Sequence, residues 1–255
     1  MGETTGISWT NHTFNPWWGC TKVSPGCDNC YAETFDKRVG GDHWGKGQPR
    51  RVMGDKYWAA PHNWNAKAKK AGVKELVFCA SMADVMDDET PAGQRERLWE
   101  LIDQTPNLIW QLLTKRPQRY QKYLPVLFRH QNVWLGATGE NQETYNLRWP
   151  VLAAAGQIHG LLTFISYEPA LGPLTLRPVK IRGELRWPDW VIFGGESGPG
   201  RRPMETTWCE SILEQCAKNG HTAPFVKQFS AATPEAGKLL VPEFLRIHEF
   251  PKGGR

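Results

Sequence analysis

The chain has 255 residues, of which 40% are hydrophobic and 22% are charged, and this composition excludes a disordered, collagen-like or coiled-coil protein. Its 31 Lys and Arg residues against 26 Asp and Glu residues give a formal net charge of +5, which permits a polyanionic partner without demanding one. No apolar run approaches the roughly 18 residues of a membrane-spanning helix, and the first residues lack the pattern of a secretory signal. We therefore expect a cytoplasmic protein with no membrane contact.

Three of the six cysteines lie close together near the start of the chain, on a loop rich in Gly and Pro. Cys20, Cys27 and Cys30 have the spacing C-x6-C-x2-C, which in a long chain without an export signal indicates metal or cluster ligation rather than disulfides. One interpretation is a cubane iron–sulfur cluster, in which three thiolates leave one iron open to another ligand. The others are a zinc site completed by His12, His43 or a distant residue, and thiols that bind no metal. The residues alone leave all three open.

Residues 36–75 follow this loop and differ in composition from the rest of the chain. They hold ten Lys and Arg residues against four Asp and Glu residues, with Trp44, Tyr57, Trp58 and Trp64 among them. We interpret them as a basic, Trp-rich insertion or lid on one domain that spans residues 1–255. Mixed cations and aromatic rings are also used to bind nucleic-acid backbones and bases, and the sequence leaves that role open.

Six short apolar runs come next, and each ends in a polar residue. Near-continuous apolar runs of this length are typical of parallel strands buried on both faces. Their spacing fits repeated strand–helix units. With a contribution from residues 7–20, they predict an α/β fold with a partial (β/α) TIM-like barrel of about six to seven parallel strands, and the alternative is a doubly wound sheet. The six runs are residues 76–81, 108–114, 133–138, 162–168, 190–196 and 223–228.

The segments between these runs carry helix signals. Helices are expected to begin at Thr90-Pro91 and at Pro117, and a capping-box pattern predicts another start at Thr207. Gly220 is a plausible end of that last helix. Pro150 interrupts the helical pattern of residues 140–156 and weakens it.

The polar residues at the strand ends are candidates for a functional site. In a barrel as in a doubly wound sheet, ligands bind at the carboxyl ends of the strands. The alternative is that strand ends are polar because they meet water. The residues in question are Ser81, Thr114, Lys115, Thr138, Glu140, Glu168, Glu196, Lys227 and Gln228. Glu196 lies in a glycine-rich turn that runs from Gly194 to Arg202.

Several of these motifs together resemble a known family. The opening segment Asn15-Pro-Trp-Trp-Gly-Cys20, the two further cysteines and Tyr31-Ala-Glu33 resemble a phage-associated, radical-SAM-like domain family of unknown function. The first cysteine gap is three residues longer than in the commonest radical-SAM spacing, C-x3-C-x2-C. The resemblance covers nearly the whole chain in order, through residues 78–84, 113–117, 140–142, 168–169, 194–201 and 226–228.

This resemblance implies a radical S-adenosylmethionine (SAM) enzyme, which uses a [4Fe–4S] cluster to generate a 5′-deoxyadenosyl radical. Cys20, Cys27 and Cys30 would hold the cluster, and Glu196 and Lys227 are candidate catalytic residues. It also implies a reductant of the flavodoxin or ferredoxin type, and a nucleic acid or nucleotide is the substrate we favour. The alternative is a zinc- or cluster-stabilised nucleic-acid-binding module without catalysis. The residues implied in cofactor binding are Tyr31, Ser81, Thr114, Lys115, Glu140, Arg148 and Glu168.

Overall fold

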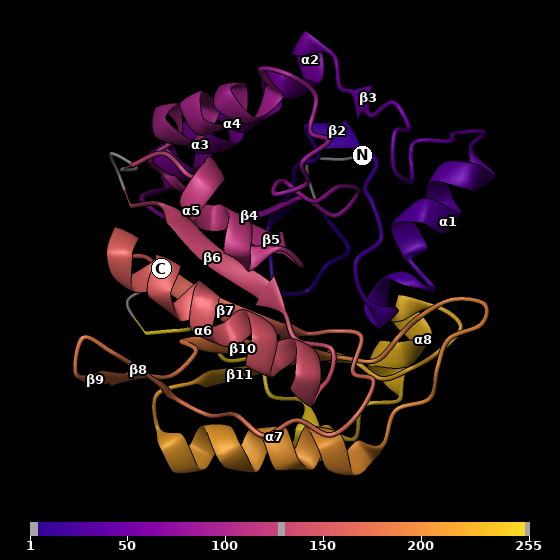
Figure 1. Ribbon diagram of the computed structural model, residues 1–255, viewed down its shortest axis with the longest axis vertical. Coiled ribbons are helices and arrows are strands. Elements are labelled where there is room, and N and C mark those ends of the chain that lie inside the picture. Colours follow the sequence, from indigo (N-terminus) through magenta and orange to yellow (C-terminus); the bar gives the residue numbers. More distant parts are fainter. Residues whose placement is uncertain (1–4, 127–130, 253–255) are drawn as a thin grey trace.

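A computed structural model describes residues 5–126 and 131–252. Seven parallel strands form one sheet that curls through 218° into a half-barrel, which confirms the predicted partial barrel (Figure 1). The strands follow one another across this sheet in chain order, without the reversal of order that defines a doubly wound sheet. The strands of the sheet, in order, are β1 (His12–Thr13), β4 (Glu75–Cys79), β5 (Leu108–Thr114), β6 (Val133–Thr138), β7 (Leu162–Tyr167), β10 (Trp190–Gly194) and β11 (Ala223–Gln228).

The remaining elements connect or flank these strands. Two antiparallel pairs lie outside the sheet, β2 (Trp17–Trp18) with β3 (Arg51–Val52) and β8 (Val179–Ile181) with β9 (Glu184–Arg186). The α-helices are α1 (Tyr31–Arg38), α2 (Asp55–Trp58), α3 (Ala60–Ala71), α4 (Gln94–Gln104), α5 (Tyr120–Tyr123), α6 (Gln142–His159), α7 (Thr206–Asn219) and α8 (Pro234–Leu239). Three short 3₁₀ helices are η1 (Pro25–Cys27), η2 (Pro117–Arg119) and η3 (Glu243–Leu245). Within the described ranges, every helix is too short or too polar to cross a bilayer.

Both faces of the sheet are buried, which explains the continuous apolar runs. One face packs against helices, as where Leu101 of α4, Trp149 of α6 and Ile212 of α7 join the largest apolar cluster. The other face forms a second cluster of mostly aromatic side chains, with Trp9 from the N-terminal segment packed against it. The members of this second cluster in the strands are Leu76, Phe78, Ile109, Trp134, Phe164, Trp190, Ile192 and Phe225.

Two predicted helix starts and one predicted interruption are wrong. The helix after Thr90 begins at Gln94, because the Thr90 hydroxyl donates to the carbonyl of Asp87 and accepts from Arg95 instead of capping a helix. Helix α7 begins at Thr206, one residue before the predicted cap. Helix α6 continues through Pro150, since a capping box at Asn141 and buried side chains on both sides offset the lost hydrogen bond. The start at Pro117 and the end at Gly220 are confirmed.

Residues 36–75 divide into two parts. Helix α3 packs on β4 and β5, so the second part covers the half-barrel. In the first part β3 pairs with β2, next to the cysteine loop, and the carbonyl of Cys20 accepts from the Gly45 amide. Trp44, Trp58 and Trp64 are buried.

Candidate functional site

The three clustered cysteines line a cavity of about 200 Å³ at the carboxyl edge of the sheet. They come from the loop between β2 and α1, which we call the cysteine loop (residues 19–30). The strand ends form the opposite wall, where Thr114, Thr138 and Ser166 stand at neighbouring positions of adjacent strands. Eight other predicted site residues line the same cavity in addition to the cysteines: Tyr31, Ser81, Thr114, Lys115, Thr138, Glu168, Glu196 and Lys227.

The three cysteines of this loop are at least partly buried, Cys27 most fully. Burial, aided by the nearby Asp84 carboxylate, raises the pKa of Cys20 to about 12, and burial also raises the pKa of Cys30. Reactive cysteines have the opposite property: their pKa is lowered, so that the thiolate forms near neutral pH, and they are partly exposed to solvent. A metal group can compensate the charge of a buried thiolate. These two thiols therefore lack the lowered pKa that is typical of a reactive cysteine.

The two histidines considered as zinc ligands do not line the cavity with the cysteines. Among residues 5–126 and 131–252, no group of three or more His, Cys, Asp or Glu side chains is arranged to hold one metal ion. His12 contacts Glu75 at 2.9 Å, and His43 contacts Asp36 at 2.8 Å, so both candidate zinc ligands lie against carboxylates away from the cavity. In a cubane cluster each thiolate binds its own iron, so the sulfur atoms need not converge on one point.

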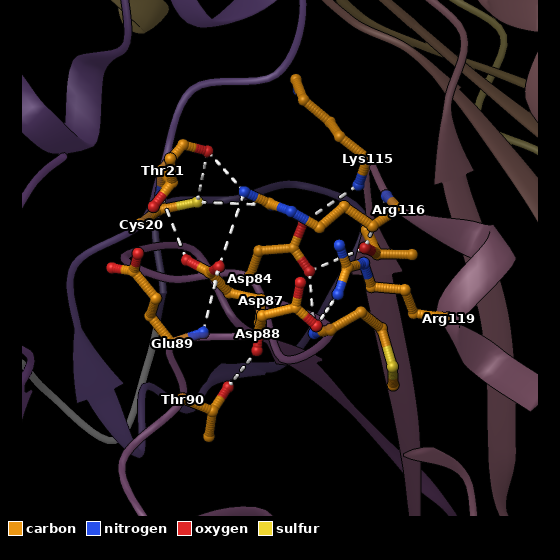
Figure 2. A network of polar contacts seen from close by, with 12 residues as sticks. Cys20, Thr21, Asp84, Asp87, Asp88, Glu89, Thr90, Lys115, Arg116 and Arg119 are labelled. Carbon is orange, nitrogen blue, oxygen red and sulfur yellow. Dashed lines mark hydrogen bonds and ion pairs between the residues drawn. The ribbon is translucent and has the colours of Figure 1, made fainter. Parts of the chain in front are cut away.

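The start of the cysteine loop is fixed by a buried ionic network (Figure 2). Arg116, which follows β5, donates to the Asp84 carboxylate at 2.8 Å, to the Thr21 carbonyl and to the sulfur of Cys20 at 3.7 Å. Arg50 donates to the Thr21 hydroxyl and to Asp87. Burial acts to lower the pKa of Arg116, but the charges of Asp84, Cys20 and Asp87 together outweigh it and the net shift is upward. The guanidinium therefore stays charged beside the sulfur.

The middle of the loop rests on Glu140, which is fully buried after β6. Its carboxylate accepts from the Ser24 hydroxyl at 2.7 Å and from Arg148 at 3.2 Å. A Cβ at Gly26 would lie 2.5 Å from the same carboxylate, so the close approach requires glycine. Glu140 and Arg148, both predicted to bind cofactor, lie beneath the loop and do not line the cavity. Lys115 does line it, 3.6 Å from Glu140.

The end of the loop is held by the glycine-rich turn after β10. Glu196 forms a bidentate ion pair with Arg202 and also accepts from the Asn29 amide at 2.9 Å. Arg202 reaches on to the Pro25 carbonyl at 2.9 Å. Burial acts to raise the pKa of Glu196, but its bonds to Arg202 and Asn29 lower the pKa below the ordinary value. Glu196 is therefore a charged anchor for the residues around Cys27.

Removing this anchor has a predicted outcome. If the three cysteines hold a cluster, as the resemblance implies, Arg202→Ala should lower the iron bound per chain after reconstitution several-fold, because Arg202 holds the Pro25 carbonyl near Cys27 and losing such outer-shell support typically costs about 10–100-fold in metal affinity. The measurement is iron and acid-labile sulfide per chain at limiting iron. Arg201→Ala is the matched control, since the neighbouring Arg201 is exposed and its hydrogen bond stays within its own turn, to Gly198. Equal iron binding by both variants would contradict the anchoring role.

Polar contacts also position the side chains on the cavity wall. The Tyr31 hydroxyl donates to the Ser81 carbonyl at 2.9 Å, while 55% of the residue remains exposed. The Ser81 hydroxyl exchanges hydrogen bonds with Asn15. Lys227 of β11 forms an ion pair with Glu168, which directly follows β7. Thr114 donates to Asp84, which ties it to the network of Figure 2.

Four of the residues that hold the cysteine loop were not among the predicted site residues. Asp84, Arg116, Asn29 and Arg202 carry the contacts described above, and none of them ends a strand. The available signal was weak: Asp84 and Arg116 are charged residues that follow buried strands within a few positions. Their partners lie 6 to 177 residues away in the chain.

The comparison with protein families decides the relationship of the chain. Residues 4–243 match the family described as "Protein of unknown function (DUF5131)". The chain belongs to this family. The match confirms the resemblance to a family of unknown function that covers nearly the whole sequence. None of the curated proteins compared with the chain matches it.

Three solved structures are similar in backbone. A mutant of spore photoproduct lyase with bound AdoMet and dinucleoside spore photoproduct is 12% identical over 84% of this chain, with a TM-score of 0.48. The same enzyme complexed with dinucleoside spore photoproduct is 13% identical over 79% of this chain, with a TM-score of 0.46. Another mutant of it is 14% identical over 84% of this chain, with a TM-score of 0.47. The matches cover 55%, 59% and 64% of those longer chains. Similarity of this size says nothing about the chemistry of the present chain.

Proposed function

We propose that this protein is a radical SAM enzyme with a [4Fe–4S] cluster held by Cys20, Cys27 and Cys30. The observation that carries the proposal is the common cavity: three thiols on one anchored loop face a row of polar strand ends in a half-barrel. A nucleic-acid-binding module without catalysis would need the cysteine loop but not the row of polar strand ends. The chemistry that these cofactors supply when bound is one-electron cleavage of SAM to methionine and a 5′-deoxyadenosyl radical.

The chain's own residues would bind and orient the cofactor. Ser81, Thr114, Lys115 and Glu168 offer hydroxyl, ammonium and carboxylate groups for the methionine and ribose parts of SAM. Tyr31, fixed by its hydroxyl and partly exposed, would place its ring against the adenine. The apolar floor of the cavity, which includes Trp9 and Phe78, would limit water around the reacting atoms.

The two candidate catalytic residues receive different roles. Both carboxylate oxygens of Glu196 are bonded to other side chains, so we assign it to positioning the cysteine loop. Lys227 lines the cavity with 15% of its side chain exposed and is paired with Glu168, so it remains our candidate for contact with the substrate.

The test is reconstitution without oxygen. Protein supplied with ferrous iron and sulfide should bind about four of each per chain, turn brown and, after reduction with dithionite, convert SAM to methionine and 5′-deoxyadenosine. A colourless protein with one zinc ion per chain and no SAM cleavage would overturn the proposal. That result would favour the nucleic-acid-binding module instead.

We further propose a nucleic acid or nucleotide substrate and, as electron donor, a cytoplasmic flavodoxin or ferredoxin. The support for the substrate is a pair of exposed cations next to the cysteine loop. Arg38 lies 5.1 Å from the ring centre of Phe35, and Arg51 lies 5.0 Å from that of Trp18. Both rings pack in the apolar cluster that includes Cys20 and Cys30. Exposed cations held on aromatic rings are suited to contact phosphates.

A salt titration tests the substrate class. Binding of a single-stranded oligothymidine should weaken with salt, and Arg38→Gln with Arg51→Gln should reduce the slope of log K against log salt by about 1.4, or 0.7 for each lost phosphate contact. The control is Lys218→Gln, an exposed cation on α7 paired with Glu214. An unchanged slope in the double variant would rule out Arg38 and Arg51 as phosphate-binding residues.

A further inference from the structure

Arg116 is a buried cation whose side chain reaches the sulfur of Cys20. Only 4% of the residue is exposed, and its Nη1 atom lies 3.7 Å from the sulfur and 2.8 Å from the Asp84 carboxylate. The distance to sulfur is within the range of an N–H···S hydrogen bond. A charged donor makes a stronger bond than a neutral one, and here it points at an atom that gains negative charge when it ligates iron.

Asp84 keeps this guanidinium in place. One oxygen of its carboxylate accepts from the Thr114 hydroxyl at 2.7 Å and the Met86 amide at 2.9 Å, and the other accepts from the Lys115 amide at 3.1 Å. Three donors besides Arg116 therefore fix the carboxylate, and the carboxylate fixes the guanidinium (Figure 2). A donor that is already oriented costs no reorganisation when the sulfur binds metal.

A positive charge at this position would favour the reduced form of a bound cluster. Reduction adds one electron to a cluster, and a nearby cation stabilises the more negative form. Solvent and salt screen the effect little, because Arg116 and Asp84 are both buried. The carboxylates of Asp84, Asp87 and Glu89, which pair with Arg116 or Arg50, oppose the effect. Removing Arg116 leaves these negative charges in place, so its loss should make reduction less favourable.

We propose that Arg116 is a positioning residue that donates to the Cys20 sulfur and raises the reduction potential of the bound cluster. This inference rests on the proposed function and adds to it the residue that sets how readily the cluster accepts its electron. Asp84 acts through Arg116, by holding the guanidinium against the sulfur.

The test is a redox titration of the reconstituted protein, followed by electron paramagnetic resonance of the reduced cluster. Arg116→Gln should lower the equilibrium constant for one-electron reduction about tenfold, which is a midpoint about 59 mV more negative. Arg116→Lys keeps the charge and should stay near the wild-type midpoint. Arg119→Gln is the matched control, because Arg119 follows three residues later and pairs instead with the exposed Asp88.

The resonance reports only molecules that hold a cluster, so the midpoint can be read even if Arg116→Gln binds less iron. A wild-type midpoint in Arg116→Gln would overturn the inference and leave the proposed function standing. An equal shift in Arg119→Gln would overturn it too, since the effect would then not depend on contact with Cys20. A wild-type protein without any iron–sulfur resonance would instead refute the proposed function itself.

Discussion

Cys27→Ala is expected to abolish both the bound cluster and SAM cleavage. Cys27 is buried at the end of η1 and lines the cavity, and alanine has no group that binds iron. Its loss should lower iron binding by more than the 10–100-fold that the loss of an outer-shell contact costs. Iron, sulfide and the visible spectrum measure the cluster, and 5′-deoxyadenosine formed after reduction measures the reaction. Cys20→Ala and Cys30→Ala should behave in the same way.

The control is Cys209→Ala, which removes a buried thiol of α7 from the packed face of the sheet. This variant should keep its iron, its colour and its SAM cleavage, because Cys209 is outside the cavity. If Cys27→Ala kept four iron atoms per chain, the assignment of the three thiols as ligands would be wrong. If Cys209→Ala lost its cluster as well, the loss would reflect general misfolding.

Asp84→Ala should reduce the free energy of unfolding of the metal-free protein by about 3–5 kcal/mol. That is the usual cost of breaking a buried ion pair from one side, and here the buried Arg116 would lose its carboxylate partner. The hydroxyl of Thr114 and two backbone amides would lose an acceptor as well. Urea denaturation followed by far-UV circular dichroism gives the free energy.

Asp88→Ala provides the comparison four residues further along the same segment. Asp88 is exposed, and its pair with Arg119 lies at the surface, where such pairs contribute about 0–1 kcal/mol. The two variants remove the same chemical group, so the difference between them isolates burial. A loss in Asp84→Ala as small as that in Asp88→Ala would show that the network of Figure 2 does not stabilise the fold.

The strands were predictable because their signal is local. A strand covered on both faces must be apolar at nearly every position, and β5, β6 and β11 have the predicted bounds. Strand β1 has only two residues and no such pattern, since it is defined by its pairing with β4. The interruption expected at Pro150 failed for a related reason: side chains of α6 buried against the sheet outweigh one lost backbone bond.

The site was predictable only in part. That polar strand ends gather at one edge follows from parallel strands, and Ser81, Thr114 and Lys227 do reach the cavity. Whether a strand-end residue supports the cysteine loop or lines the cavity does not follow from its position in a strand–helix unit. Glu140 and Glu168 end equivalent units, yet Glu140 supports the cysteine loop from beneath and Glu168 lines the cavity.

The sequence by itself determined the parallel strands, the direction in which their polar ends point and the three clustered thiols, because each is a pattern of neighbouring residues. The tertiary structure alone decided that three strand-end loops hold the cysteine loop, through Arg116, Glu140 and the Glu196–Arg202 pair. An ion pair between distant residues leaves no periodic trace in the chain. Its partners are chosen by which loops the curled sheet brings together and by the cost of burying a charge without a counter-ion.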